Sequence, residues 1–136
     1  MHRYKIIDIE GIGAVYAKKL KAAGIRSVNA LLKHGATRDG RKKLVKATGI
    51  DSSLILKWVN MADLYRIKGV GSEYSELLEK AGVDTVKELR KREPANLFNK
   101  MKKVNSANPI VRQLPALKSV KRWVAHAKKL DPKITY

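Results

Sequence analysis

The sequence predicts an all-α protein built from two similar repeats, and two observations carry this prediction. First, the segment IEGIGAVYAKKLKAAGI at residues 9–25 returns 58 residues later as IKGVGSEYSELLEKAGV at residues 67–83. Such self-similarity at a fixed period is typical of a repeated supersecondary unit. Second, apolar residues recur at helical spacing between glycines and capping residues, without the alternation of a strand. We therefore expect a compact helical domain of nine or ten short helices, with residues 1–64 and 65–136 as its two repeats.

Each helix expected in the first repeat has a start signal and a stop signal. The helix that follows Gly13 should end at Gly24, which suits a left-handed cap. Polar residues that cap helix N-termini then alternate with glycines that stop helices. In chain order these signals are Ser27 before and Gly35 after VNALLKHG, Thr37 or Asp39 before and Gly49 after GRKKLVKAT, and Asp51 before SSLILKWVNMADLYRI.

The second repeat follows the same plan with a longer loop. Asp84 or Thr85 should cap VKELRKRE, which Pro94 stops, and a helix near residues 95–104 should follow. The last helix, LKSVKRWVAHAKKL, resembles KWVNMADL of the first repeat at an offset of 65 rather than 58. About seven residues were therefore gained between the two, most simply in the loop NPIVRQLP at residues 108–115.

Charge is the compositional feature that bears on function. The chain has 30 Lys and Arg against 12 Asp and Glu, a net charge of +18. The excess lies in residues 1–66 and 95–136, each with a net charge of +9, around a neutral middle. Thermophile enrichment in lysine normally brings matching glutamate, so this imbalance favours a polyanionic partner. The absence of cysteine excludes disulfides and thiolate chemistry. Without an apolar run of membrane length or a secretory leader, we expect a cytoplasmic protein with no membrane partner.

Both copies of the repeat contain a Gly-apolar-Gly sequence, which predicts a tight turn. Glycine reaches positive φ and allows close backbone approach. The middle residue, Ile12 or Val70, should point into the core. The turn leads into a helix whose first amides have no partner within the helix, and such amides suit an anion such as phosphate.

The segments IIDIEGIGAVYAKKL (6–20) and DLYRIKGVGSEYSELL (63–78) resemble the helix-hairpin-helix motif, with Ala17 and Ser75 at the small position where its helices cross. The whole chain resembles a poorly characterised family of tandem helix-hairpin-helix proteins, through GRKKLVKATGID, WVNMADLYRIKGVG and AGVDTVKELRKRE. This resemblance implies duplex DNA binding without sequence specificity, in which hairpin amides contact phosphates in the minor groove. The hairpin residues that it designates are Gly11, Ile12, Gly13 and Ala14 in the first copy and Gly69, Val70, Gly71 and Ser72 in the second. Some such hairpins hold a potassium or sodium ion, and no other cofactor is expected.

The two copies differ in the charge that follows the hairpin. Lys18, Lys19 and Lys21 follow the first, whereas Glu73, Glu76 and Glu79 follow the second. Carboxylates in a first helical turn compete with phosphate for the helix dipole. We therefore assign nucleic-acid contact to the first hairpin and a mainly structural role to the second. The cluster Arg41, Lys42 and Lys43 is expected to neutralise further phosphates, because cations near a helix N-terminus oppose its dipole.

Other function classes find less support in the sequence. His2, His34 and His126 have no partner at metal-ligand spacing, and no pair of carboxylates indicates catalysis, so we expect no enzymatic activity. Trp58 and Trp123 recur at equivalent positions, and we expect both in the core rather than as stacking platforms for bases. Two alternatives stay open: a scaffold module that binds an acidic protein, and binding of structured RNA. If the partner is DNA, the protein belongs with the nucleoid. The sequence leaves the oligomeric state open.

Overall fold

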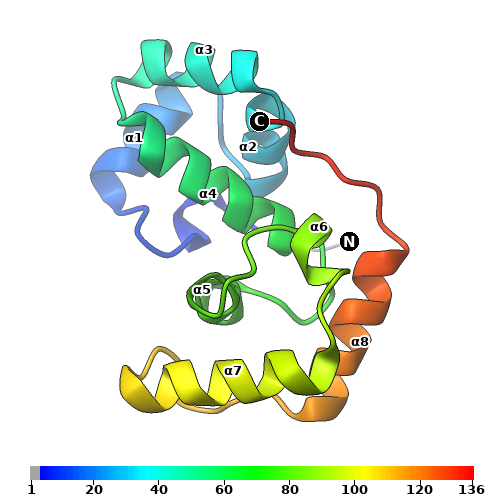
Figure 1. The fold of residues 1–136 in the computed structure, drawn as a ribbon. Coiled ribbons are helices and arrows are strands. Elements are labelled where there is room, and N and C mark those ends of the chain that lie inside the picture. Colours follow the sequence, from blue (N-terminus) through cyan, green and yellow to red (C-terminus); the bar gives the residue numbers. More distant parts are fainter. Residues whose placement is uncertain (1–3) are drawn as a thin grey trace. The chain divides into compact units, whose positions relative to one another are not determined.

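The computed structural model describes residues 4–136, so His2 lies outside the described residues. Within them the fold is all-α, as predicted, with eight α-helices, one 3-10 turn and no strand (Figure 1). In chain order the elements are η1 (Ile6–Asp8), α1 (Ala14–Ala22), α2 (Val28–Gly35), α3 (Arg38–Thr48), α4 (Ser52–Leu64), α5 (Ser72–Lys80), α6 (Val86–Leu89), α7 (Pro94–Ala107) and α8 (Leu117–Lys128).

The chain divides into two compact units. The first unit runs to Asp63 and takes in the C-terminal residues Lys133–Tyr136, and the second unit comprises Leu64–Pro132. In the first unit, α1 contacts η1 and α3, and α2 packs on α3. In the second unit, α7 packs on α5 and α8, and α8 also contacts α6.

The helix boundaries of the first unit follow the predicted caps closely. The Ser27 hydroxyl accepts a hydrogen bond from the Ala30 amide at 3.1 Å, and Thr37, rather than Asp39, caps α3 by accepting from the Gly40 amide at 3.0 Å. Gly24 and Gly49 take the left-handed conformation after α1 and α3, with φ of 88° and 72°. These are the C-terminal caps that the glycine pattern predicts.

The ends of α4 and α6 differ from prediction. Helix α4 ends at Leu64 instead of continuing to Ile67, because the chain turns there and the Ile67 amide donates to the Leu64 carbonyl at 3.0 Å. Helix α6 stops at Leu89 instead of Glu93. It is followed by turns in which the Arg92 guanidinium donates to the Ala81 carbonyl at 3.2 Å. These hydrogen bonds compete successfully with continuation of the helices.

Pro94 does not stop the preceding helix, which already ends at Leu89, and instead begins α7. Pro94 is the first residue of α7, where its missing N–H removes no helical hydrogen bond. The Glu93 carboxylate caps the helix by accepting from the Asn96 amide at 2.6 Å. The helix then continues to Ala107, beyond the predicted end at residue 104.

The C-terminal residues are held on the first unit by several hydrogen bonds. Ile134 is buried, and the Thr135 amide donates to the Ala36 carbonyl at 2.8 Å. The Arg41 guanidinium donates to the Thr135 carbonyl at 2.7 Å, and the Tyr136 hydroxyl donates to Asn60 at 3.2 Å. No sequence pattern indicated this attachment.

Candidate nucleic-acid interface

The two Gly-apolar-Gly segments form the same turn. The Ile12 amide donates to the Ile9 carbonyl at 3.1 Å, and in the second copy Val70 donates to Ile67 at 3.0 Å. The side chains of Ile12 and Val70 are buried, as predicted. The sequence repeat is therefore also a repeat of local backbone structure.

The first glycine of each turn is required by its backbone conformation. Gly11 and Gly69 have φ of 92° and 91°, a region that residues with a side chain rarely occupy. A tryptophan indole also lies against each of them. A Cβ at Gly11 would come within 3.4 Å of Trp58 Nε1, and one at Gly69 within 3.2 Å of Trp123 Nε1.

These tryptophans sit in the core beside a recurring tyrosine. Trp58 and Trp123 are 1% and 4% exposed, which confirms the predicted core position. The rings of Tyr16 and Trp58 lie 5.1 Å apart, and those of Tyr74 and Trp123 lie 5.3 Å apart. The tryptophan of each pair thus packs against the first glycine of its turn, and neither indole is free to stack on bases.

The second glycine of each turn leaves the following helix without a capping side chain. Gly13 precedes α1 and Gly71 precedes α5, both with extended backbone. Their carbonyls accept the first helical bonds, from Ala17 and Ser75, each at 2.9 Å. In the part of the chain that the structure describes, the amides of Gly13 and Ala14 donate no hydrogen bond, and both residues are exposed. The first hairpin therefore presents main-chain donors to solvent.

The lysines after the first hairpin divide into two groups. Lys18 and Lys21 follow Ala14 at spacings of four and seven residues, so the three share one face of α1. Side chains on a helix lean toward its N-terminus, which directs Lys18 back toward the open amides. Lys19 instead lies over the Tyr16 ring, with Nζ 6.0 Å from the ring centroid. We call the exposed surface of Gly11, Gly13, Ala14, Lys18 and Lys21 the hairpin face.

The second hairpin is less open than the first. Gly71 and Ser72 are half-buried. Of the three glutamates expected to compete with phosphate, only Glu73 lies in the first turn of α5. Glu76 and Glu79 lie further along the helix and are half-buried, and Glu79 Oε2 is buried without a hydrogen-bond partner. The charge difference between the hairpins at the helix start is therefore smaller than the sequence suggested.

The basic cluster of α3 is spread over different environments. Arg41 donates to the carbonyls of Gly35, Ala36 and Thr135 at 2.9, 3.3 and 2.7 Å, and its guanidinium lies 5.6 Å from the Tyr136 ring centroid. Burial lowers the pKa of Arg41 below its ordinary value, with Tyr136 acting against this shift and Arg38 in the same direction. This arginine serves the fold.

The two lysines that follow differ from each other as well as from Arg41. Lys43 forms an exposed ion pair with Asp39 at 3.3 Å. Lys42 is exposed and lines a cavity of about 500 Å³ together with Arg38. Arg41 is the fourth residue of α3, and Lys42 and Lys43 follow it. The three cations therefore lie beyond the first residues of the helix and oppose its dipole less strongly than predicted.

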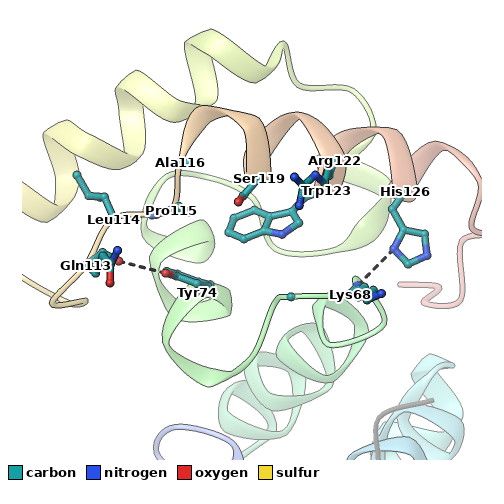
Figure 2. Close-up of a pocket in the computed structure, with 11 residues that line it drawn as sticks. Lys68, Tyr74, Gln113, Leu114, Pro115, Ala116, Ser119, Arg122, Trp123 and His126 are labelled. Carbon is teal, nitrogen blue, oxygen red and sulfur yellow. Dashed lines mark hydrogen bonds between the residues drawn. The ribbon is translucent and has the colours of Figure 1, made fainter.

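A cavity of about 720 Å³ lies beside the second hairpin (Figure 2). One wall is a single face of α8, another is the hairpin with Tyr74, and a third is the loop 113–116. We call it the α8 pocket. Its polar and aromatic side chains include Lys68, Tyr74, Ser119, Arg122, Trp123 and His126.

Sequence reasoning did not bring these residues together. The sequence shows His126 without a partner at metal-ligand spacing and Arg122 at the end of the basic run KSVKR (118–122). The available signal was the spacing of Ser119, Arg122, Trp123 and His126, which places them on one helix face. The position of Lys68 directly before Gly69 could not be connected to that face without the fold.

Comparison with protein families gives one match. Residues 10–130 match the family described as "Domain of unknown function (DUF4332)". The chain belongs to this family. The matched residues include both Gly-apolar-Gly turns and all eight α-helices of the described chain, and they leave out η1 and residues 131–136. Searches of curated proteins and of solved structures find no match. No helix in residues 4–136 of this DUF4332 protein combines the length and apolar character needed to span a membrane.

Proposed function

We propose that this DUF4332 protein is a tandem helix-hairpin-helix protein that binds duplex DNA without sequence specificity. The supporting observation is the hairpin face, where uncapped main-chain donors lie on one side of a helix with Lys18 and Lys21. The two turns with matching φ at Gly11 and Gly69 support the tandem motif.

Two kinds of interaction contribute to binding. The amides of Gly13 and Ala14 donate to one phosphate, assisted by the positive end of α1. The ammonium groups of Lys18 and Lys21 then neutralise neighbouring phosphates. Neither kind of contact reads base edges, so affinity is insensitive to sequence. The net charge of +18 attracts the polyanion over a longer range.

The first hairpin carries the contact, and the second supports the fold. Gly13 and Ala14 are exposed, whereas Gly71 and Ser72 are half-buried and Glu73 occupies the first turn of α5. A carboxylate at that position repels phosphate and uses part of the helix dipole.

Proline at the first position of each helix provides a matched test. Ala14→Pro removes one amide donor, while proline suits the first helical position and the extended Gly13 before it. Ser72→Pro makes the same change after Gly71. We expect Ala14→Pro to weaken binding of a random duplex about tenfold in an electrophoretic mobility-shift assay, which corresponds to one charge-assisted hydrogen bond. Ser72→Pro should leave the affinity unchanged.

The same assay separates the alternatives. If the folded Ala14→Pro protein binds duplex DNA as the wild type does, the hairpin contact is wrong. Tighter binding to double-stranded RNA than to duplex DNA would show that the partner is structured RNA and not DNA. Retention of an acidic protein at 300 mM salt, with duplex released, would favour the scaffold function.

A further inference from the structure

We propose that the α8 pocket binds a nucleoside phosphate, with the phosphate at its cationic end and the base at its aromatic and apolar end. The pocket belongs to the second unit and uses none of the hairpin-face residues, so this inference goes beyond the duplex-binding proposal. Its volume of about 720 Å³ lies within the range of small-molecule sites.

The two ends of the pocket differ in chemistry. Lys68, Arg122 and His126 lie together at one end in Figure 2, and Tyr74 and Leu114 lie at the other. No carboxylate lines the pocket, although α5 itself carries three glutamates. A cationic end joined to an aromatic end complements a ligand that is anionic at one end and planar at the other.

Several hydrogen bonds fix the walls. The Lys68 amide donates to His126 Nδ1 at 3.3 Å, so a neutral His126 keeps its proton on Nε2 as a donor. The Tyr74 hydroxyl donates to the Gln113 carbonyl at 3.2 Å (Figure 2). These bonds tie the hairpin to α8 on one side and to the loop on the other, which gives the pocket a preformed shape.

The loop wall is itself anchored from α7. Asn105 Oδ1 accepts from the amides of Ile110 and Val111 at 2.7 and 3.0 Å, and its side-chain amide donates to the Val111 carbonyl at 3.1 Å. Pro115 is buried. This loop contains the residues that the second repeat gained, since only Gly49–Asp51 separate α3 from α4 in the first unit. The insertion therefore builds a wall that the first repeat lacks.

The first repeat also provides an internal comparison for the side chains. At the offsets of 58 and 65, Lys68 corresponds to Glu10, Ser119 to Leu54 and His126 to Met61. Met61 is buried, whereas His126 is half-buried and lines the pocket. At these three positions the first repeat carries acidic or apolar residues and the second carries cationic or polar ones, whereas Arg122 and its counterpart Lys57 are both cationic. Packing alone does not require that exchange.

The indole N–H signals of the two tryptophans allow a direct test by two-dimensional ¹H–¹⁵N NMR. Trp123 lines the α8 pocket, and Trp58 occupies the equivalent place in the first unit. Titration of the full chain with adenosine monophosphate should shift the Trp123 signal and leave the Trp58 signal in place. Saturation should require at least tenfold less ligand than with adenosine alone or inorganic phosphate alone.

Substitutions at equivalent positions provide the controls. Arg122→Ala should weaken binding of adenosine monophosphate about tenfold, as expected for loss of a charged hydrogen-bond donor. Lys57→Ala, at the corresponding position of the first repeat, should have no effect. Ser119→Leu combined with His126→Met gives these two positions the side chains of the first repeat and should abolish binding, while the remaining spectrum shows that the fold is retained.

The source of the nucleotide is distinguished by two further ligands, a short single strand with a 5′-phosphate and the same strand with a 5′-hydroxyl. If the Trp123 signal reports a higher affinity for the phosphorylated strand than for adenosine monophosphate, the ligand of the pocket is a phosphorylated strand end. If it reports a higher affinity for adenosine monophosphate, the ligand is a free nucleotide. An unchanged Trp123 signal at millimolar adenosine monophosphate would overturn the proposal. Equal effects of Arg122→Ala and Lys57→Ala would also overturn it. Neither result bears on duplex binding, which Ala14→Pro tests separately.

Discussion

Replacement of the hairpin glycines by alanine tests how the turn is built, because the three positions differ in what an added methyl group meets. Gly11 has φ of 92°, which an alanine can adopt only with strain of about 1–3 kcal/mol. Its Cβ would lie 3.4 Å from Trp58 Nε1, an ordinary contact, so strain dominates. We expect Gly11→Ala to lower the free energy of unfolding by about 2 kcal/mol.

Gly69→Ala should be more damaging than Gly11→Ala. The backbone strain is the same, since φ is 91°, but the methyl group would lie 3.2 Å from Trp123 Nε1, closer than an ordinary van der Waals contact, so the indole would have to shift. Overpacking of this kind adds about 1 kcal/mol.

Gly13→Ala is the matched control. Its φ of −85° suits any residue, and its Cβ would meet no atom within 4 Å. The loss of a glycine helix cap and the reduced entropy of the unfolded chain oppose each other at about 0.5 kcal/mol each, so the net change should be near zero.

Urea unfolding followed by tryptophan fluorescence measures all three variants. The expected order of destabilisation is Gly69→Ala, then Gly11→Ala, then Gly13→Ala. If Gly13→Ala destabilised the protein as much as Gly11→Ala, the argument from positive φ would be refuted.

Two further predictions concern stability. Burial, with Glu88 and Glu79 nearby, raises the pKa of Asp84 above its ordinary value, so the folded state binds this proton more tightly and loses stability as pH rises toward the raised value. Asp84→Asn should therefore raise the free energy of unfolding at pH 7 by roughly 0.5 kcal/mol. This gain should shrink as pH falls toward 3.8. If urea titrations showed the same gain at both pH values, the electrostatic cause would be contradicted. Arg41→Ala should lower the free energy of unfolding by about 2 kcal/mol, because it removes hydrogen bonds to three carbonyls. The control Lys42→Ala should change the free energy of unfolding by less than about 0.5 kcal/mol. Equal losses for the two variants in thermal or urea unfolding would exclude the structural role of Arg41.

Local signals in the sequence predicted most of the fold. Ser27 and Thr37 cap the helices that they precede, and Gly24 and Gly49 end helices, because these residues act through their own backbone and nearest neighbours. The end of α6 was predicted wrongly. There, a long-range hydrogen bond from Arg92 to Ala81 favours the turn over a further helical turn.

The candidate sites were less accessible to sequence reasoning. A run of basic residues does not show which of them the fold uses, so Arg41 and Lys42 were indistinguishable before the carbonyls of Gly35 and Ala36 were located. The α8 pocket depends on Lys68 and His126, which are 58 residues apart. Helical spacing identifies one wall of such a pocket, and only tertiary structure supplies the other two.

The salt dependence of duplex binding tests the central claim most directly, because its slope counts the phosphates that the protein neutralises. A protein that engages six to ten phosphates should lose about 10³–10⁵ in affinity between 50 and 200 mM salt. Lys18→Gln combined with Lys21→Gln should reduce the slope by about two. Lys43→Gln, which removes a lysine paired with Asp39, should reduce it by less than one. Equal slopes for the wild type and the Lys18/Lys21 double variant would contradict the assignment of phosphate contact to the hairpin face.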